Sequence, residues 1–122
     1  MSDLKSTQIR LTREELYELS GICSVVWNEK FDQSLIFKIK MTLLYRVLIY
    51  VTIQELKSKF LEKAKKWAIT DRKKGWIWFN PMQQAALTSM YEIVQNPLLE
   101  KILAKANLDN SEVQQNNVSE VN

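Results

Sequence analysis

The sequence predicts an all-α fold, a small bundle of about four helices packed around one long central helix. The first supporting observation is that the 122 residues include only two Gly and two Pro, so the tight turns of many-stranded sandwiches and barrels are scarce. The second is that apolar residues recur at steps of three and four over long stretches. The length suits one domain, which we place at residues 1–106, followed by a disordered polar tail at 107–122.

The first helix is expected to begin at Thr12. The run Thr12-Arg-Glu-Glu15 is a capping box, in which the Thr hydroxyl and the Glu carboxylate each accept a backbone N–H at the start of a helix. Apolar residues then recur at steps of three, four and three, which places them on one face: Leu16, Leu19, Cys23 and Val26. Gly21 interrupts the helix and marks either a weak point or a close contact with another helix.

The long central helix is predicted from about Asp32, a suitable N-cap, to Trp67, because this stretch contains no Gly or Pro. Its apolar residues form two seams on opposite sides. One seam contains Ile36, Ile39, Leu43, Val47, Tyr50 and Leu61, and is widened by Leu44, Leu48 and Val51. The other contains Ile49, Ile53, Leu56 and Phe60. The β-branched residues of 47–53 leave a strand there as the alternative. Lys38, Lys40 and Arg46 argue against a membrane span.

The helical pattern breaks near residues 68–79. A polar, turn-like patch at 70–75 is followed by Trp76-Ile-Trp-Phe79, which is short, aromatic and strand-like. We expect a short aromatic hairpin or extended bridge at 68–79. The alternative is an α+β fold in which this segment belongs to a two-stranded sheet.

Two Asn-Pro pairs predict the last two helices, because Asn is a good N-cap and Pro suits the first helical position. The helix after Asn80-Pro81 should run to about Gln95 and bury Met82, Ala86, Met90, Ile93 and Val94. The helix after Asn96-Pro97 should be short and bury Leu98, Leu99, Ile102, Leu103 and Ala106. From Asn107 the chain is rich in Asn, Gln, Ser and Glu, which predicts the disordered tail.

The absence of histidine and the presence of a single cysteine exclude most catalytic and metal chemistry. Cys-His and Ser-His dyads need an imidazole, and transition-metal sites need several thiolates or imidazoles. The apolar neighbours of Cys23 predict a packed, unreactive thiol. The N-terminus lacks the pattern of a signal peptide, which favours a cytoplasmic, reducing environment. We therefore expect no enzyme activity, no catalytic residue, no cofactor and no metal.

A basic segment at 57–78 is the clearest hint of a ligand. Cations interleaved with tryptophans are typical of proteins that bind single-stranded nucleic acid. The candidate nucleic-acid residues are Lys57, Lys59, Lys63, Lys66, Arg72, Lys73, Lys74, Trp76 and Trp78. The alternative is a solvated helix face, because Glu55–Lys59 and Glu62–Lys66 are favourable pairs one helical turn apart.

The leading functional hypothesis is a non-enzymatic helical module for protein–protein interaction or oligomerisation. A central helix that is apolar on both sides has more apolar surface than three short partners can cover, so a second copy of the chain or another protein should cover the rest. The candidate interface residues are Ile49, Ile53, Leu56, Phe60 and Trp67. Small basic nucleic-acid binding is the second hypothesis. A regulator or inhibitor of a larger enzyme, carried by a mobile element, is a third that fits the size but is supported by no residue.

Overall fold

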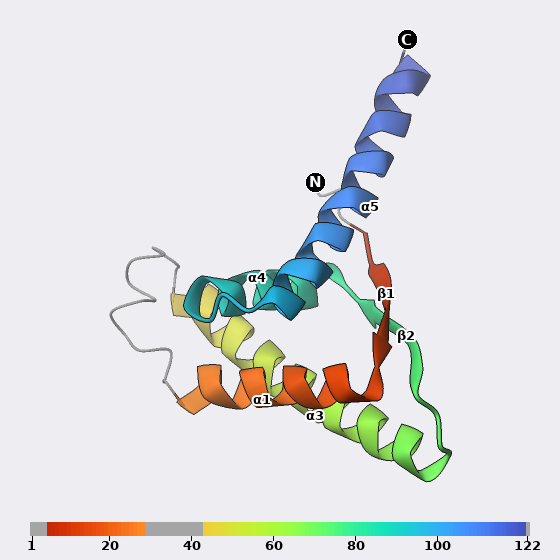
Figure 1. The fold of residues 1–122 in the computed structure, drawn as a ribbon. Helices are drawn as coiled ribbons and strands as arrows, with labels where there is room; N and C mark the ends of the chain where they lie inside the picture. The colour runs from red at the N-terminus through yellow and green to blue at the C-terminus, as the bar shows by residue number, and fades with distance from the viewer. Residues whose placement is uncertain (1–4, 29–42, 122) are drawn as a thin grey trace.

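The computed structural model describes the backbone of residues 5–28 and 43–121. In chain order its elements are β1 (Thr7–Thr12), α1 (Arg13–Asn28), α3 (Leu43–Ile69), β2 (Lys74–Phe79), α4 (Pro81–Ile93) and α5 (Pro97–Val121) (Figure 1). The described chain is therefore mostly helical with a small two-stranded antiparallel sheet. This agrees with the predicted class, and the α+β alternative describes it more closely.

The helices surround one hydrophobic core to which every element contributes. α1 and α3 make the most extensive helix contact, α4 packs on α3, and α5 packs on α4 and β1. In Figure 1 the sheet closes the side of the molecule at which α1 begins, and α5 extends past the other elements toward the C-terminus. The sheet thus covers the core with one face and leaves the other face to solvent.

The capping box at the start of α1 is confirmed. The backbone N–H of Thr12 donates to Glu15 Oε1 at 2.8 Å, and the N–H of Glu15 donates to Thr12 Oγ1 at 3.1 Å. The four apolar residues predicted to share a face, Cys23 among them, are completely buried. Burial raises the pKa of the Cys23 thiol to about 12, so the thiol is packed and unreactive, as predicted.

α3 is continuous through residues 47–53, so the alternative of a strand there is wrong. Packing of the seam that contains Ile49 and Ile53 outweighs the low helix propensity of the β-branched residues. The predicted N-cap Asp32, together with Ile36 and Ile39, lies outside the described residues. α3 ends two residues later than predicted.

Asp71 terminates the α3 region with a positive φ of 57°, the left-handed conformation that commonly follows a helix. The N–H of Arg72 then donates to the carbonyl of Trp67 at 2.7 Å, which turns the chain toward β2.

β1 was not predicted by the sequence analysis. It pairs antiparallel with β2, in a register that runs from Thr7 opposite Phe79 to Thr12 opposite Lys74. The predicted strand-like character of 76–79 is confirmed, but its partner is the N-terminal segment and not the neighbouring residues 68–73. The sequence signal for β1 is the alternation of polar and apolar residues in Thr7–Thr12, where Ile9 and Leu11 point to the core.

Both Asn-Pro signals are confirmed as helix starts. Asn80 Oδ1 accepts the N–H of Gln83 at 2.8 Å and Gln83 Oε1 accepts the N–H of Asn80 at 2.9 Å, which is a second capping box. Asn96 Oδ1 accepts the N–H of Leu98 at 2.8 Å. α4 ends at Ile93, slightly before the predicted end. Met82, expected in the core, is 36% exposed, whereas the other residues of the two predicted apolar faces are buried or packed against the core.

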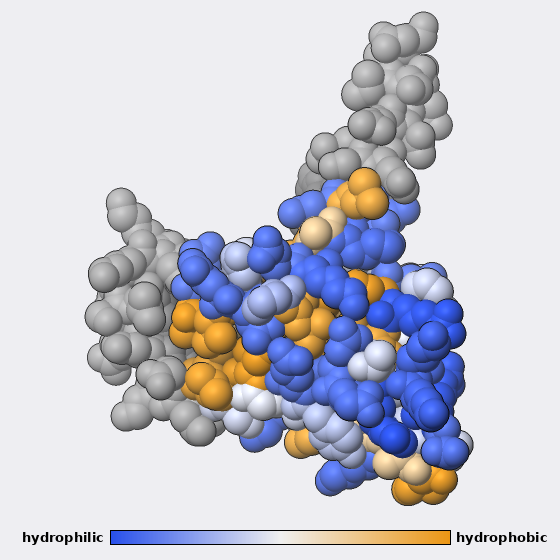
Figure 2. Space-filling model, viewed as in Figure 1, coloured by the Kyte–Doolittle hydropathy of each residue, from blue (hydrophilic) through white to orange (hydrophobic). Residues whose placement is uncertain are grey.

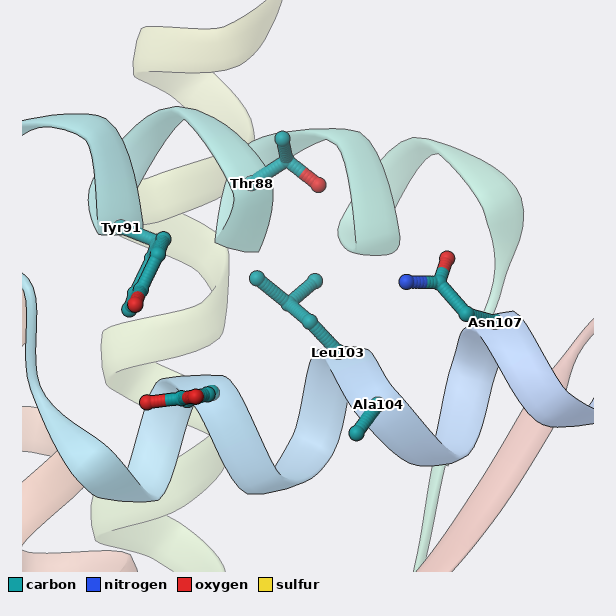
Figure 3. A pocket seen from close by; sticks show the side chains of 6 residues that line it. Thr88, Tyr91, Leu103, Ala104 and Asn107 are labelled. Carbon is teal, nitrogen blue, oxygen red and sulfur yellow. The ribbon is translucent and has the colours of Figure 1, made fainter.

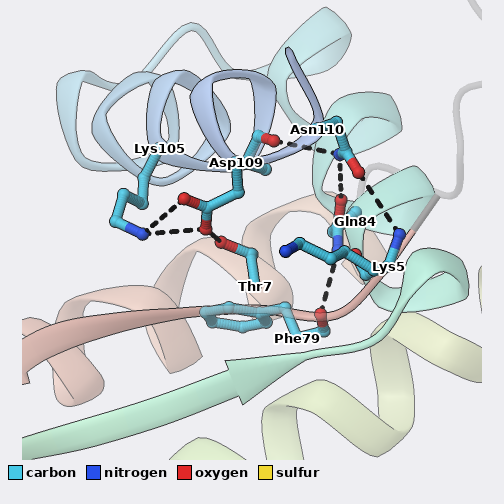
Figure 4. Close-up of polar contacts among 8 residues, drawn as sticks. Lys5, Thr7, Phe79, Gln84, Lys105, Asp109 and Asn110 are labelled. Carbon is cyan, nitrogen blue, oxygen red and sulfur yellow. Dashed lines mark hydrogen bonds and ion pairs between the residues drawn. The ribbon is translucent and has the colours of Figure 1, made fainter. Parts of the chain in front are cut away.

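α5 continues to Val121, through the segment for which the sequence predicts a disordered tail. Figure 4 shows Asp109 and Asn110 pointing toward the strand that follows Lys5. Thr7 Oγ1 donates to Asp109, Lys105 Nζ donates to both Asp109 carboxylate oxygens at 2.8 Å, and the N–H of Lys5 donates to Asn110 at 3.2 Å. The prediction differs from the structure at 107–110 because polar side chains, rather than apolar ones, hold this turn of α5 on β1.

Removing the hydroxyl of Thr7 is expected to weaken this connection. Thr7 is 1% exposed, and Thr7→Val keeps its shape but removes the donor to Asp109, which should lower the free energy of unfolding by about 1–2 kcal/mol. Denaturant titration measures the change. Ser6→Ala, at an exposed neighbouring position, is the control and should change stability by less than about 0.5 kcal/mol.

The same connection predicts a dependence on pH. Hydrogen bonds from Lys105 and Thr7 lower the pKa of Asp109. The ionised Asp109 carboxylate therefore stabilises the folded state. Its contribution is complete above the ordinary aspartate pKa of about 3.9, and it is lost as the pH falls through the lowered pKa of the folded state. The acid-induced loss of stability should therefore be smaller in Thr7→Val than in the unmodified protein. Equal loss in the two proteins would contradict the role of Thr7.

The two glycines should respond to alanine in opposite directions. Gly21 is exposed within α1 and has nothing within 4 Å of an added Cβ, so the interpretation as a close helix contact is wrong. Gly21→Ala should stabilise the protein by about 0.5–1 kcal/mol. At Gly75 an added Cβ would lie 2.7 Å from Trp67 Cζ2, so Gly75→Ala should destabilise it by about 1–3 kcal/mol. If the denaturation midpoints of both variants shifted in the same direction from that of the unmodified protein, this packing would be contradicted.

Candidate nucleic-acid interface

The outer face of the β1–β2 sheet carries two neighbouring tryptophans. Side chains along β2 alternate, so that Ile77 and Phe79 are buried while Trp76 and Trp78 point away from the core. Trp76 is 51% exposed and Trp78 is 55% exposed. Residues two apart on a strand are about 6.6 Å apart along it, so the two indoles lie side by side on one face.

β1 contributes the other half of this face. Its register places Arg10 opposite Trp76 and Gln8 opposite Trp78, and side chains at opposed positions of an antiparallel pair are neighbours. We call the outward-facing residues the sheet platform, defined as Gln8, Arg10, Lys74, Trp76 and Trp78. Arg10 and Gln8 were not predicted because β1 was not recognised, although the alternation of polar and apolar residues in Thr7–Thr12 carries that signal.

Trp67 has a different environment from the platform tryptophans. It is 5% exposed and lies beneath Gly75, where the absence of a side chain on the strand makes room for the indole. The Arg72 guanidinium carbon lies 5.4 Å from the centroid of the Trp67 ring, and Arg72 Nε donates to the carbonyl of Lys74 at 3.0 Å. Trp67 and Arg72 therefore hold the start of β2 on α3.

Lys59 fixes the other end of β2. Its ammonium donates to the backbone carbonyl of Trp78 and lies 5.1 Å from the centroid of the Phe79 ring. Burial lowers the pKa of Lys59, and the neighbouring Lys63 lowers it further. Lys59 thus stabilises the open edge of β2 and positions the sheet platform, rather than projecting freely into solvent.

The nine candidate nucleic-acid residues do not share one surface in the structure. Lys57 lies on the α1 side of α3, close enough to the Cys23 thiol to oppose the rise in its pKa. Lys59 and Arg72 support β2, as described above. Arg72 is exposed even though it supports β2, and the other exposed members are Lys63, Lys66, Lys73, Lys74, Trp76 and Trp78.

The two helical ion pairs that the sequence suggested do not form. Among the described residues, neither Glu55 nor Glu62 has an oxygen within 4.0 Å of a lysine ammonium, and the ion pairs found are Lys101–Glu15 and Lys105–Asp109. Lys63 and Lys66 of α3 thus form no ion pair within the described chain, and their ammonium groups remain open to an anionic ligand.

The five candidate protein-interface residues lie in the core and not on a surface. Four of them are no more than 1% exposed and Trp67 is 5% exposed. The seam that the sequence analysis assigned to an interface is the one that α1 and α4 cover. The opposite side of α3 is the exposed one, and its stripe comprises Leu44, Val47, Leu48 and Val51, which are 42–71% exposed.

Figure 2 shows how polar and apolar residues are distributed over one face of the molecule. Apolar atoms gather on the side that borders the grey atoms at the left, whereas hydrophilic atoms dominate the side of the sheet, apart from an apolar cluster at the lower right, where α3 ends. Of the three cations that argued against a membrane span, Arg46 is partly buried, and Lys38 and Lys40 lie outside the described residues.

A shallow pocket of about 400 Å³ lies between α4 and α5. Figure 3 shows Leu103 of α5 pointing between the helices, with Thr88 and Tyr91 on α4. Its lining residues are Thr88, Tyr91, Glu100, Leu103, Ala104 and Asn107. Among the lining residues only Glu100 is charged at neutral pH, and its negative charge makes the pocket unsuited to phosphates. The pocket shares no residue with the sheet platform.

Neither the described residues nor a likeness to known proteins points to a second site. In residues 5–28 and 43–121 we find no cluster of three or more potential metal ligands. In the same ranges no helix combines the length and apolar character needed to cross a bilayer. No family model, curated protein or solved structure matches the chain at a significant level.

Proposed function

We propose that this protein is a non-enzymatic, single-stranded nucleic-acid-binding protein that holds its ligand on the sheet platform. The observation that carries the proposal is the pair of adjacent, half-exposed tryptophans Trp76 and Trp78, which lie next to Arg10 and Lys74 on one face of the sheet. Successive bases stack on aromatic side chains, and nearby cations hold the phosphates.

The energetics favour a ligand at this position. Each base stacked on an aromatic side chain contributes about 1–3 kcal/mol. Exposed large aromatic side chains that lie together mark binding surfaces more often than isolated ones do. Lys63 and Lys66, which form no ion pair within the described chain, add an electrostatic contribution that decreases as salt increases.

The same features favour single strands over duplexes, with little dependence on sequence. In a duplex the faces of the bases are already stacked on one another, so the indoles of Trp76 and Trp78 have no access to them. Stacking also uses a surface that every base has, so it discriminates weakly between sequences.

Titration of the full chain with oligothymidylate of about ten nucleotides tests the proposal. We expect quenching of tryptophan fluorescence, weaker binding at about 200 mM than at about 50 mM salt, and weaker binding of a duplex of the same length. Inorganic polyphosphate is the control, because it can neutralise the cations but cannot stack on the indoles, and it should not cause the same quenching. The proposal fails if the oligothymidylate does not bind at low salt, or if it binds no better than the duplex.

A second candidate function is the association of two copies of the chain through the exposed stripe of α3. The stripe favours it because Leu44, Val47, Leu48 and Val51 repeat at the spacing of one helix face. Light scattering over a range of concentrations tests it. A dimer that Leu48→Glu converts to a monomer would support this function, and a monomer at every concentration would contradict it.

A further inference from the structure

Lys59 identifies which flank of α3 faces the open edge of β2. Its ammonium donates to the Trp78 carbonyl. The N–H of Arg13 donates to the Lys73 carbonyl, and hydrogen-bonded pairs alternate along an antiparallel ladder, so the Trp78 carbonyl lies on the edge of β2 that does not pair with β1. The inner face of the sheet rests on the same helix, since the rings of Phe60 and Phe79 meet edge to face with centroids 6.1 Å apart. The flank that carries Lys59 therefore runs beside β2.

Two more lysines share this flank. With 3.6 residues per turn, Lys63 and Lys66 lie about 40° and about 20° from Lys59 around the helix axis. They are exposed, and Lys63 is close enough to Lys59 to lower the pKa of its ammonium. Together the three side chains form a row about 10 Å long beside β2.

The remaining two lysines of this part of α3 lie on other sides. Lys57 is about 160° from Lys59 around the axis, and Lys65 is about 120° from it. Lys57 faces α1, as its effect on the Cys23 thiol shows. One helix thus carries three lysines on the flank beside β2, of which Lys63 and Lys66 are exposed, and two lysines directed elsewhere.

The spacing of this row matches that of the tryptophans. From Lys59 to Lys63 the helix rises about 6 Å, and from Trp78 to Trp76 the strand advances about 6.6 Å. Glu55 and Glu62 lie on the next row outward around α3, farther from the core, and among the described residues neither carboxylate lies within 4.0 Å of a lysine ammonium. A single strand of nucleic acid whose bases stack on Trp76 and Trp78 would therefore place its phosphates near lysines that form no ion pair within the described chain.

We propose that Lys63 and Lys66 form the phosphate track of the site, so that the sugar-phosphate backbone of a bound single strand runs along the β2 edge and not across β1. This inference rests on the proposed function and specifies how the ligand lies in that site. Lys59 acts as a positioning residue, because its ammonium is already used by the Trp78 carbonyl.

Two double variants of equal charge test the track. Lys63→Gln/Lys66→Gln removes the row beside β2, and Lys57→Gln/Lys65→Gln removes the same charge from the other sides of the same helix. The measurement is the slope of log K against log salt for oligothymidylate. For a single strand each phosphate contact contributes about 0.7 to this slope, so the first variant should reduce it by about 1.4 and the second should leave it nearly unchanged.

The outcomes separate this inference from the proposed function. If both double variants change the slope equally, the track is wrong, while binding to the sheet platform is unaffected. If the unmodified chain does not bind oligothymidylate at low salt, the proposed function and the track both fail. Because all four lysines are partly or fully exposed, thermal unfolding should confirm that both variants fold.

Discussion

Replacing both platform tryptophans, as Trp76→Ala/Trp78→Ala, is expected to weaken the binding of oligothymidylate by at least about 30-fold. Each stacked base is worth about 1–3 kcal/mol, and two lost stacks give at least about 2 kcal/mol. Both side chains are more than half exposed, so the free energy of unfolding should change little. Fluorescence anisotropy of labelled oligothymidylate measures the affinity without relying on the protein's own tryptophans.

Two controls make this result specific. Tyr17→Ala removes an aromatic side chain that is 44% exposed on α1, and it should leave the affinity unchanged. Trp76→Phe/Trp78→Phe keeps an aromatic surface at both positions and should restore part of the affinity lost with alanine. Equal affinity of the alanine variant and the unmodified chain would exclude the sheet platform as the site.

Phe60→Ala is expected to have the largest effect on stability. Phe60 is completely buried and its ring packs against Phe79, so its truncation should lower the free energy of unfolding by about 3–5 kcal/mol. Val51→Ala, on the exposed side of the same helix, should change it by less than about 0.5 kcal/mol. Denaturant titration of both variants measures the difference.

The same experiment distinguishes a core residue from an interface residue. If Phe60 is a core residue, the loss of stability in Phe60→Ala is independent of protein concentration. If Phe60 instead holds a dimer together, the unfolding midpoint of the unmodified chain rises with concentration. A midpoint that depends on concentration in the unmodified chain and not in Phe60→Ala would show that this seam is an interface after all.

The helix starts could be predicted from the sequence because they depend on local chemistry. Thr12 and Glu15, and Asn80 and Gln83, satisfy backbone groups within four residues of themselves, so a short motif contains all the information needed. The apolar face of α1 was predictable for the same reason, since periodicity alone places its residues together.

The orientation of α3 could not be predicted in this way. Its two apolar seams are nearly equivalent in sequence, and only the packing of α1 and α4 decides that Phe60 faces the core while Val51 faces solvent. The residues that the sequence assigned to an interface therefore lie in the core. A residue-level pattern cannot show which of two apolar faces a distant helix will cover.

The candidate site was predictable in part. Trp76 and Trp78 were identified because cations and aromatic residues lie together in the sequence, but Arg10 reaches the same face only through the pairing of β1 with β2. Lys59 was identified as a ligand-binding cation, whereas in the structure its ammonium serves the Trp78 carbonyl. Long-range pairing and side-chain hydrogen bonds of this kind depend on the folded chain.

The indole N–H signals of the four tryptophans offer the most direct measurement of the central claim, with each signal assigned from a single Trp→Phe variant. Upon titration with oligothymidylate, the signals of Trp76 and Trp78 should shift together and saturate with the binding curve, while that of the buried Trp67 changes least. Binding that leaves the signals of Trp76 and Trp78 in place would contradict the account, because the ligand would then occupy another surface.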